Sequence, residues 1–164
     1  MTVNLSNIKT QLKAVLDTAN TTTAAFDLST GLSTRVQKVL KVHPGLIPQQ
    51  ASFYPWVTTF VDKKEVEHAT IAKDQITAKR MGTVTMKVVG GVWEPTVSDV
   101  TADAADEAIE KLMENVEEVV RRSFKLNNAV QWTKTEDVSY YAWPVKEDTH
   151  LRFGVLTLTA KVDY

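Results

Sequence analysis

The chain has 164 residues, of which 43% are hydrophobic and 24% are charged, and this predicts one globular domain with a core of its own. Nineteen lysine and arginine residues against twenty acidic residues leave a formal charge of −1, which excludes a protein that holds DNA by a global basic field. Cysteine is absent, which excludes a disulfide framework, a thiolate metal site and a cysteine nucleophile. Residues 1–13 contain no long apolar run, so we expect neither a signal peptide nor a membrane span there.

The first predicted element is an amphipathic helix over Leu5–Asp17, because apolar residues recur there at helical spacing. The segment that follows, Thr18–Thr34, is rich in threonine and contains Phe26, but it has no clear periodicity, so we predict a loop or arm. A polar segment of this kind is ordered only when something ties it down. A neighbouring subunit or the chain's own domain could do so, and the sequence leaves both open.

Two strands and a long loop are predicted in the next part of the chain. Arg35–His43 forms the first strand and ends at Pro44-Gly45, because proline cannot donate to a ladder and glycine permits the turn. Trp56–Val61 is rich in β-branched and aromatic residues and forms the second strand. Asp62–Lys79 is polar and charged, and we predict a long exposed loop there.

A third strand is predicted at Gly82–Val89, where apolar and polar residues alternate strictly. Gly90-Gly91 is then expected to turn the chain toward Val92–Pro95. A long helix follows over Ala102–Lys125, and its glutamates lie four positions before lysine or arginine, which predicts ion pairs on a solvated face. One continuous apolar stripe runs along this helix and consists of Ala105, Ala108, Ile109, Leu112, Met113, Val116, Val119, Val120 and Phe124.

Two further strands are predicted after a turn at Asn127-Asn128, namely Val138–Trp143 and Arg152–Tyr164. The order is therefore helix, three strands, long helix, two strands. Because strands and helices do not alternate regularly, a doubly wound parallel sheet is not expected. The sequence predicts a single α+β domain over residues 1–164, with a mixed, mostly antiparallel β-sheet and two α-helices packed on one face.

No motif in the chain predicts catalysis, so we expect no enzyme, no catalytic residue, no cofactor and no metal. The paired glycines lack the lysine or the helix start that a phosphate loop needs. Glu65-x-Glu67-His68 offers oxygen and nitrogen ligands to a metal, but a charged loop without helical spacing favours a solvated surface. The glutamates of the long helix could suggest a paired-acid site, and their ion pairs with lysine and arginine explain them better.

Aromatic residues indicate contacts between subunits. Trp93, Trp132 and Trp143, together with neighbouring tyrosines, lie at predicted strand ends rather than within the apolar stripes. Core packing explains any single one, but as a group they fit a subunit interface, where tryptophan and tyrosine are enriched. The basic pair Lys63-Lys64 could contact phosphate, although short basic pairs are weak grounds for a nucleic-acid reader. The interface candidates are Trp93, Trp132, Trp143, Lys63, Lys64, Glu65, Glu67 and Phe26.

The pattern resembles the tail terminator proteins of lambda-like long-tailed bacteriophages and their relatives in the neck. The resemblance runs from about Leu5 to Tyr164 and starts from the short N-terminal helix and the proline that leads into the strand Tyr54–Phe60. The strand Thr83–Val89, the helix with its AADEAIEKLMENVEEVV run and the closing strand Gly154–Tyr164 continue it. Where many relatives have a glycine-containing turn after the long helix, this chain has Leu126-Asn127-Asn128-Ala129.

The resemblance implies a structural role in a virion. Members of this family form a hexameric ring on the last ring of the tail tube, halt tube polymerisation and present a surface to the head connector proteins. The implied partners are further copies of the chain, the tail tube protein and the head-completion or connector protein, with DNA only passing through the lumen and no membrane. A near-neutral chain suits that passage, because a strongly basic lumen would bind phosphates.

Two alternatives remain open beside the tail terminator. One is a head-completion, neck or tail-completion protein of the same assembly. The other, of a different class, is a small enzyme or ligand-binding domain that uses the aromatic-rich end as a pocket. A ring protein is expected in the virion, at the tail or neck, after assembly in the host cytoplasm. A pocket enzyme predicts grouped histidine and carboxylate side chains in a cleft.

Overall fold

A computed structural model of the chain describes residues 4–67, 81–95, 100–145 and 149–163. Its strands form one five-stranded sheet in the order β1-β2-β3-β5-β4, in which β1 and β2 are parallel and the other neighbours are antiparallel. The predicted α+β class with a mostly antiparallel sheet is confirmed. The elements are α1 Leu5–Ala19, β1 Lys38–Leu40, short 3₁₀ turns at Pro44–Leu46 and Ala51–Phe53, β2 Trp56–Glu67, β3 Met81–Pro95, α2 Val100–Arg122, β4 Trp132–Val145 and β5 Thr149–Asp163.

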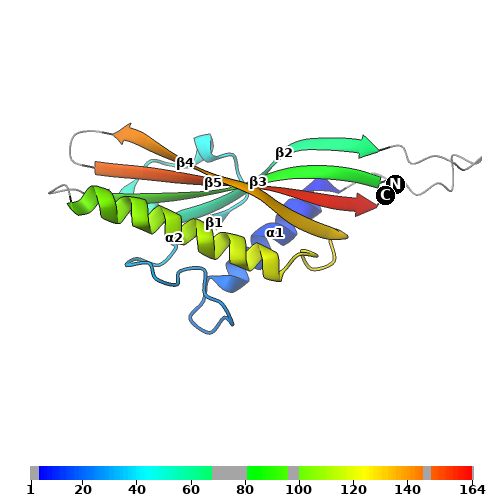
Figure 1. The fold of residues 1–164 in the computed structure, drawn as a ribbon, viewed down its shortest axis with the longest axis horizontal. Helices are drawn as coiled ribbons and strands as arrows, with labels where there is room; N and C mark the ends of the chain where they lie inside the picture. The colour runs from blue at the N-terminus through cyan, green and yellow to red at the C-terminus, as the bar shows by residue number, and fades with distance from the viewer. Residues whose placement is uncertain (1–3, 68–80, 96–99, 146–148, 164) are drawn as a thin grey trace, which may run out of the picture.

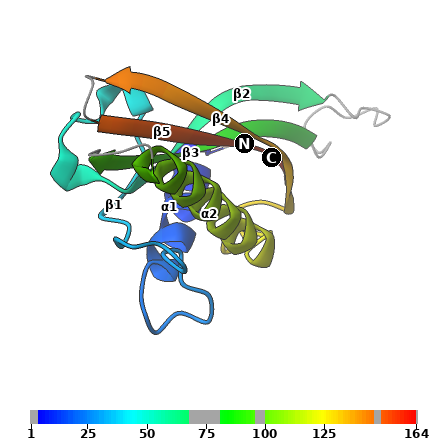
Figure 2. The same ribbon diagram turned by 60° about the vertical axis from the view of Figure 1, so that its left-hand side comes forward.

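Both helices cover the same face of the sheet, as predicted (Figures 1 and 2). The long helix α2 crosses β3 and β5, and α1 lies beside it against β1 and β2. Leu112 and Val116, at the centre of the predicted apolar stripe, are both 0% exposed. Alternate residues of β3 and β5, among them Val88 and Leu156, complete this main core from the sheet side. Burial of this stripe explains why a helix with so many charged residues forms here.

The C-terminal end of α2 lies earlier than predicted. The helix stops at Arg122, so Phe124 falls beyond it and is 47% exposed. The backbone then turns through three left-handed residues, Leu126, Asn127 and Asn128, with φ values of 45°, 55° and 64°. Asparagine tolerates this conformation better than most residues, which lets it stand where a glycine would be the ordinary choice. Of the predicted helical ion pairs, Glu118–Arg122 forms, while Lys111 binds Glu114 and Arg121 binds Glu118.

The expected turn at Gly90-Gly91 is wrong, because β3 runs through both glycines without a break. A Cβ atom on Gly90 would lie 2.9 Å from the Met113 sulfur, and one on Gly91 would lie 2.6 Å from the Trp56 ring. The two glycines therefore face opposite sides of the sheet and let α2 and Trp56 approach its backbone. Gly154, opposite Gly90 on β5, serves the same close approach of Met113.

A second, smaller cluster covers the other face of the sheet at one end. Ile47, Tyr54, Trp56, Val89 and Leu151 form it, on strand positions that alternate with those of the main core. The segment between β1 and β2, which includes the cis Tyr54-Pro55 bond, supplies Ile47 and Tyr54. This end of the sheet is therefore buried on both faces.

Several strand boundaries differ from the predicted ones. The first strand is only Lys38–Leu40, because its parallel pairing with β2 stops where the chain turns toward Pro44. The predicted loop Asp62–Lys79 is wrong over residues 62–67, which continue β2 and pair with β3 as far as Met81. The remainder of that predicted loop lies outside the described residues. On the other side of the sheet, β4 begins at Trp132, before the predicted Val138.

The threonine-rich arm docks on its own domain, which is one of the two ways of holding it that the sequence leaves open. The Asn115 side chain on α2 is 2% exposed and donates hydrogen bonds to the carbonyl oxygens of Leu28 at 3.0 Å and Thr30 at 2.8 Å. Asn20 donates to the carbonyl oxygen of Val36 at 2.9 Å. Leu28 enters the main core and is fully buried. The carbonyl oxygens of Leu28 and Thr30 in the arm therefore have a buried hydrogen-bond donor on α2.

Candidate subunit interface

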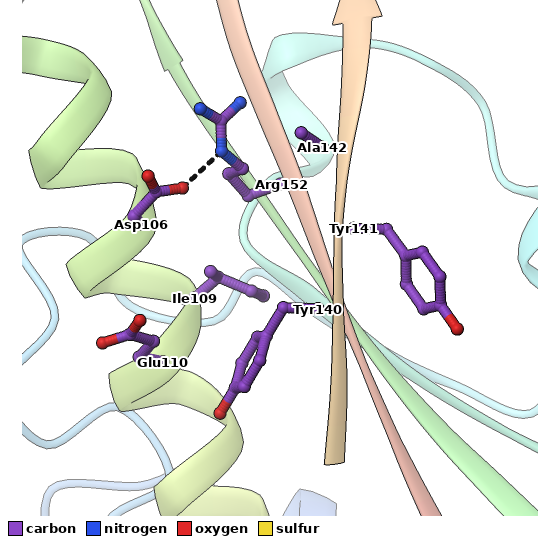
Figure 3. A pocket seen from close by; sticks show the side chains of 7 residues that line it. All are labelled: Asp106, Ile109, Glu110, Tyr140, Tyr141, Ala142 and Arg152. Atoms are coloured by element: carbon purple, nitrogen blue, oxygen red, sulfur yellow. Dashed lines mark hydrogen bonds and ion pairs between the residues drawn. The ribbon is translucent and has the colours of Figure 1, made fainter.

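The outer side of β4 forms one boundary of the sheet and carries exposed aromatic residues. Trp132 is 40% exposed at its start, and Tyr140 and Tyr141 are 48% and 57% exposed farther along. Tyr140 reaches toward α2, whereas Tyr141 points away from the helices, as expected for successive residues of a strand (Figure 3). Exposed aromatic side chains beside an open strand are typical of a protein–protein contact.

An open hollow of about 290 Å³ lies between α2 and β4. Within it, Arg152 of β5 is paired with Asp106 of α2, so the arginine is already neutralised by a carboxylate (Figure 3). Burial of the phenol raises the pKa of Tyr140, and the negative charges of Glu110, Glu114 and Glu117 on α2 raise it further. The residues that line the hollow are Asp106, Ile109, Glu110, Tyr140, Tyr141, Ala142 and Arg152.

The hollow combines phenol, carboxylate and guanidinium groups. The raised pKa of the Tyr140 phenol keeps it protonated near neutral pH, and the described residues that line the hollow include no histidine. Within the described ranges, no group of three or more histidine, aspartate or glutamate residues could hold a metal ion. In the same part of the chain, no helix is both long and apolar enough to cross a membrane.

The half of β4 that precedes the tyrosines is charged. Lys134 binds Glu136 at 3.1 Å, and Thr159 of β5 donates a hydrogen bond to the same glutamate at 2.9 Å. These contacts hold the pKa of the Glu136 carboxyl below its usual range, with the lysine hydrogen bond as the largest cause. On the helix side, the hydroxyl of Thr135 donates to Glu117 of α2 at 3.3 Å. A negative side chain therefore lies directly behind this part of the strand.

The opposite side of the sheet is bounded by the second half of β2, which is also charged. Lys63 and Glu65 are paired with each other, and Lys87 of β3 binds Asp62 at 3.2 Å. Lys63 is 64% exposed along its side chain. Lys64 is exposed as well, and its register partner on β3 is Val84, a residue of the main core, so Lys64 lies on the helix side of the sheet.

The predicted interface residues are distributed over several places. Lys63, Lys64 and Glu65 lie together on β2, and Trp132 lies at the start of β4. Trp93 packs edge-on against Tyr54 in the second cluster, with ring centres 5.4 Å apart. Phe26 packs against the main core beneath Arg122, whose guanidinium lies 5.1 Å from the ring centre.

The remaining two candidates are described by their backbone alone. Trp143 is paired with Leu151, and Glu67 is paired with Met81, while both side chains lie outside the described part of the structure. His68, the third group of the expected metal alternative, also lies outside it.

The predicted strand Val138–Trp143 leaves out the charged start of β4, which begins at Trp132. Lys134 and Glu136 alternate there with Thr133 and Thr135, and this period of two was the available signal. The sequence alone predicts only that Glu117 lies on a solvated helix face. Its proximity to β4 depends on how the helix lies across the sheet. Comparison with protein-family models and with curated proteins found no match to this chain.

Proposed function

We propose that this chain is a structural virion protein that forms a ring at the head-proximal end of a phage tail. In this role it caps the tail tube, stops tube polymerisation and joins the tube to the head connector. The ring is hexameric, as in the family that the sequence resembles, and DNA passes through its lumen. The chain acts without a cofactor and is not an enzyme.

The observation that carries this proposal is the one-sided sheet, in which the described residues leave an open strand on each side. Both helices cover one face, and the order β1-β2-β3-β5-β4 leaves the second half of β2 at one side and β4 at the other. A subunit with two different contact surfaces on opposite sides binds two neighbours head to tail, and such contacts close into a ring when the rotation between copies is right. The exposed aromatic residues of β4 support the same role.

Removal of the gene from the phage that encodes it tests the proposal. The expected particles have tails of uncontrolled length that are not joined to heads, and the protein supplied in trans restores normal virions. Tails of normal length with unattached heads would instead favour the alternative of a head-completion, neck or tail-completion protein. Normal infectious particles without the protein would overturn all of these roles.

A small enzyme or ligand-binding domain is the alternative from a different class. The hollow between α2 and β4 is the observation that favours it, because it combines two phenols with carboxylates and an arginine. Such a protein would leave virion assembly unchanged on deletion and would stay a monomer or dimer in native mass spectrometry. A ring of copies in that measurement would speak against it.

A further inference from the structure

Two open strand edges of this chain lie on opposite sides of one sheet. β1 pairs with β2 only from Trp56 to Thr58, and over the rest of β2 the described residues provide no strand on its outer side. On the other side, β4 is the last strand of the sheet. We call residues 61–65 the β2 rim and residues 132–142 the β4 rim. Each rim presents backbone N–H and C=O groups to which another strand could bind.

The directions of these strands permit continuation of the sheet by another copy. β2, β3, β5 and β4 are neighbours in that order and each pair is antiparallel. The two rims of one chain therefore run in opposite directions. When a second copy lies beside the first in the same orientation, its β2 rim is antiparallel to the β4 rim of the first, and the alternation continues across the contact.

The two rims carry the same charge order. The β2 rim contains Lys63-Lys64-Glu65 and the β4 rim contains Lys134-Thr135-Glu136, so a lysine precedes a glutamate by two residues on each. Within each rim these two side chains are paired with each other, on the face of the sheet away from the helices. Antiparallel pairing of two such segments sets each lysine opposite a glutamate, whereas parallel pairing sets like charges opposite each other.

The middle residue of each segment determines which rims pair. Two β2 rims would set Lys64 against a second Lys64. Two β4 rims would bring together the Glu117 carboxylates that lie behind each Thr135. A β2 rim against a β4 rim brings Lys64 beside Thr135 and Glu117, on the helix side of both sheets. Each of these antiparallel pairings sets lysine opposite glutamate at the outer positions, but only the mixed pairing avoids like charges at the middle position, and it is the head-to-tail arrangement.

We infer that the β2 rim of one copy pairs antiparallel with the β4 rim of the next, with Lys64 opposite Thr135, Lys63 opposite Glu136 and Glu65 opposite Lys134. The partner is a second copy of this chain, and the inference rests on the proposed ring. It deepens that proposal by naming the surfaces and the register.

The proposed register also fits the geometry of a closed ring. Within one chain, Lys63 is level with Lys134 through Thr85 and Thr159, whereas the contact sets Lys63 opposite Glu136, so the strands are staggered at each step. Glu136 lies at the irregularity between Thr135 and Asp137, so this stagger is smaller than two full residue spacings, and closure of a sheet requires a stagger.

Irregularities in both strands limit the pairing to a short stretch. Register shifts lie between Val61 and Lys63 on β2 and between Thr135 and Asp137 on β4. Such bulges protect an edge from pairing along its whole length. Asp62, at the first of them, stays bound to Lys87 of its own chain. The tyrosines of β4 lie beyond the paired stretch and stay accessible to another protein.

Cysteine cross-linking tests the inference, because the chain has no cysteine of its own. The variant Lys64→Cys/Thr135→Cys is treated with a short bismaleimide, both as free protein and on the tips of tail tubes. The expected product is a ladder of covalent oligomers that ends at the full ring. Lys64→Cys and Thr135→Cys alone should give no ladder. Lys64→Cys/Tyr141→Cys is the matched control, since Tyr141 lies on the other face of β4 and outside the paired stretch.

Each outcome bears on the inference separately from the proposed function. A strong dimer from either single variant would overturn it in favour of two like rims. Rings seen by native mass spectrometry or on tube tips without a ladder would overturn the rim contact and leave the ring proposal standing. If the chain stays monomeric both as free protein and on tail tubes, and if the phage makes normal tails without it, the rim contact and the proposed ring are both overturned.

Discussion

The threonine-rich arm at residues 18–34 and the charged segment at residues 62–65 differ in what surrounds them in the fold. Both are polar and both are predicted as loops. The arm is fastened to its own domain by Asn115, which binds two of its carbonyl oxygens from within the core. The charged segment forms a strand on the open side of the sheet, with its side chains exposed. A polar segment thus docks on its domain where a buried group satisfies its backbone, whereas the charged segment is held by its ladder with β3 and keeps its side chains in solvent.

The largest expected effect comes from the helix that holds the arm. Leu112 lies one turn before Asn115 and is 0% exposed, so Leu112→Ala should lower the free energy of unfolding by about 2–5 kcal/mol. Urea denaturation measures this loss. Leu46→Ala is the matched control, because Leu46 is 75% exposed, and it should change stability by less than about 0.5 kcal/mol. A loss below that value for Leu112→Ala would contradict the packing of α2 on the sheet.

The next prediction separates the arm from the charged segment. Asn115→Ala leaves the carbonyl oxygens of Leu28 and Thr30 without their buried donor, which should cost about 1–3 kcal/mol. Amide hydrogen exchange should rise in the arm and stay unchanged in residues 62–65. Asn7→Ala, at an exposed asparagine of α1, serves as the control. Equal loosening of both segments would show that the arm does not depend on this side chain.

A smaller, pH-dependent effect belongs to the ion pair at the end of the arm. Arg35 donates a hydrogen bond to Asp27 at 2.7 Å, and this bond holds the pKa of the Asp27 carboxyl below its ordinary value of 3.8, against the opposing effect of burial. Because the pKa is lower in the folded state, the stabilisation is present above about pH 3.8 and is lost as the pH falls through the folded-state pKa.

Asp27→Asn should therefore lower stability modestly at pH 7, and the difference from the unaltered chain should narrow toward pH 3. Chemical denaturation at both pH values measures it. If the free energy of unfolding differs by the same amount at pH 7 and pH 3, the loss of stability comes from packing rather than from the charge of Asp27.

The comparison of the two segments also shows which features of the fold can be predicted from the sequence. Helical spacing in α2 and strict alternation in β3 predict the fold class, the covered face and the buried centre at Leu112 and Val116. Those patterns are local, because helical spacing and strand alternation depend only on residues that are close together in the sequence. Asn115 stands among glutamates in the sequence, and its burial follows from the arm that folds back over it.

The errors arise where a distant part of the chain decides the local structure. Gly90-Gly91 has the composition of a turn, but the need for space beneath Met113 and Trp56 explains both glycines. The continuation of β2 past Val61 depends on its pairing with β3, which charge composition does not indicate. The candidate interface could be predicted as a set of aromatic and charged residues, while their division between two opposite rims required the strand order.

The prediction with the smallest expected effect on stability tests the role of the charged segment at residues 62–65. Lys64 is exposed on the helix side of β2 and interacts within its own chain, and exposed interactions of this kind contribute little, so Lys64→Glu should lower the free energy of unfolding by about 1 kcal/mol or less. In the inferred contact the new carboxylate meets Glu117 of the next copy, and like charges at an interface oppose association. The protein concentration needed for ring formation should rise roughly tenfold or more, as measured by mass photometry.

The double variant Lys64→Glu/Glu117→Lys restores opposite charges across the contact, since every copy carries both changes and contributes one to each interface. Assembly should return toward that of the unaltered chain, while Glu117→Lys alone should impair it by setting two lysines together. Lys9→Glu makes the same charge change on α1, at a residue that belongs to neither rim, and should leave assembly unchanged. Impairment that is merely additive in the double variant would contradict the pairing of these two side chains, because only residues that interact across an interface rescue each other.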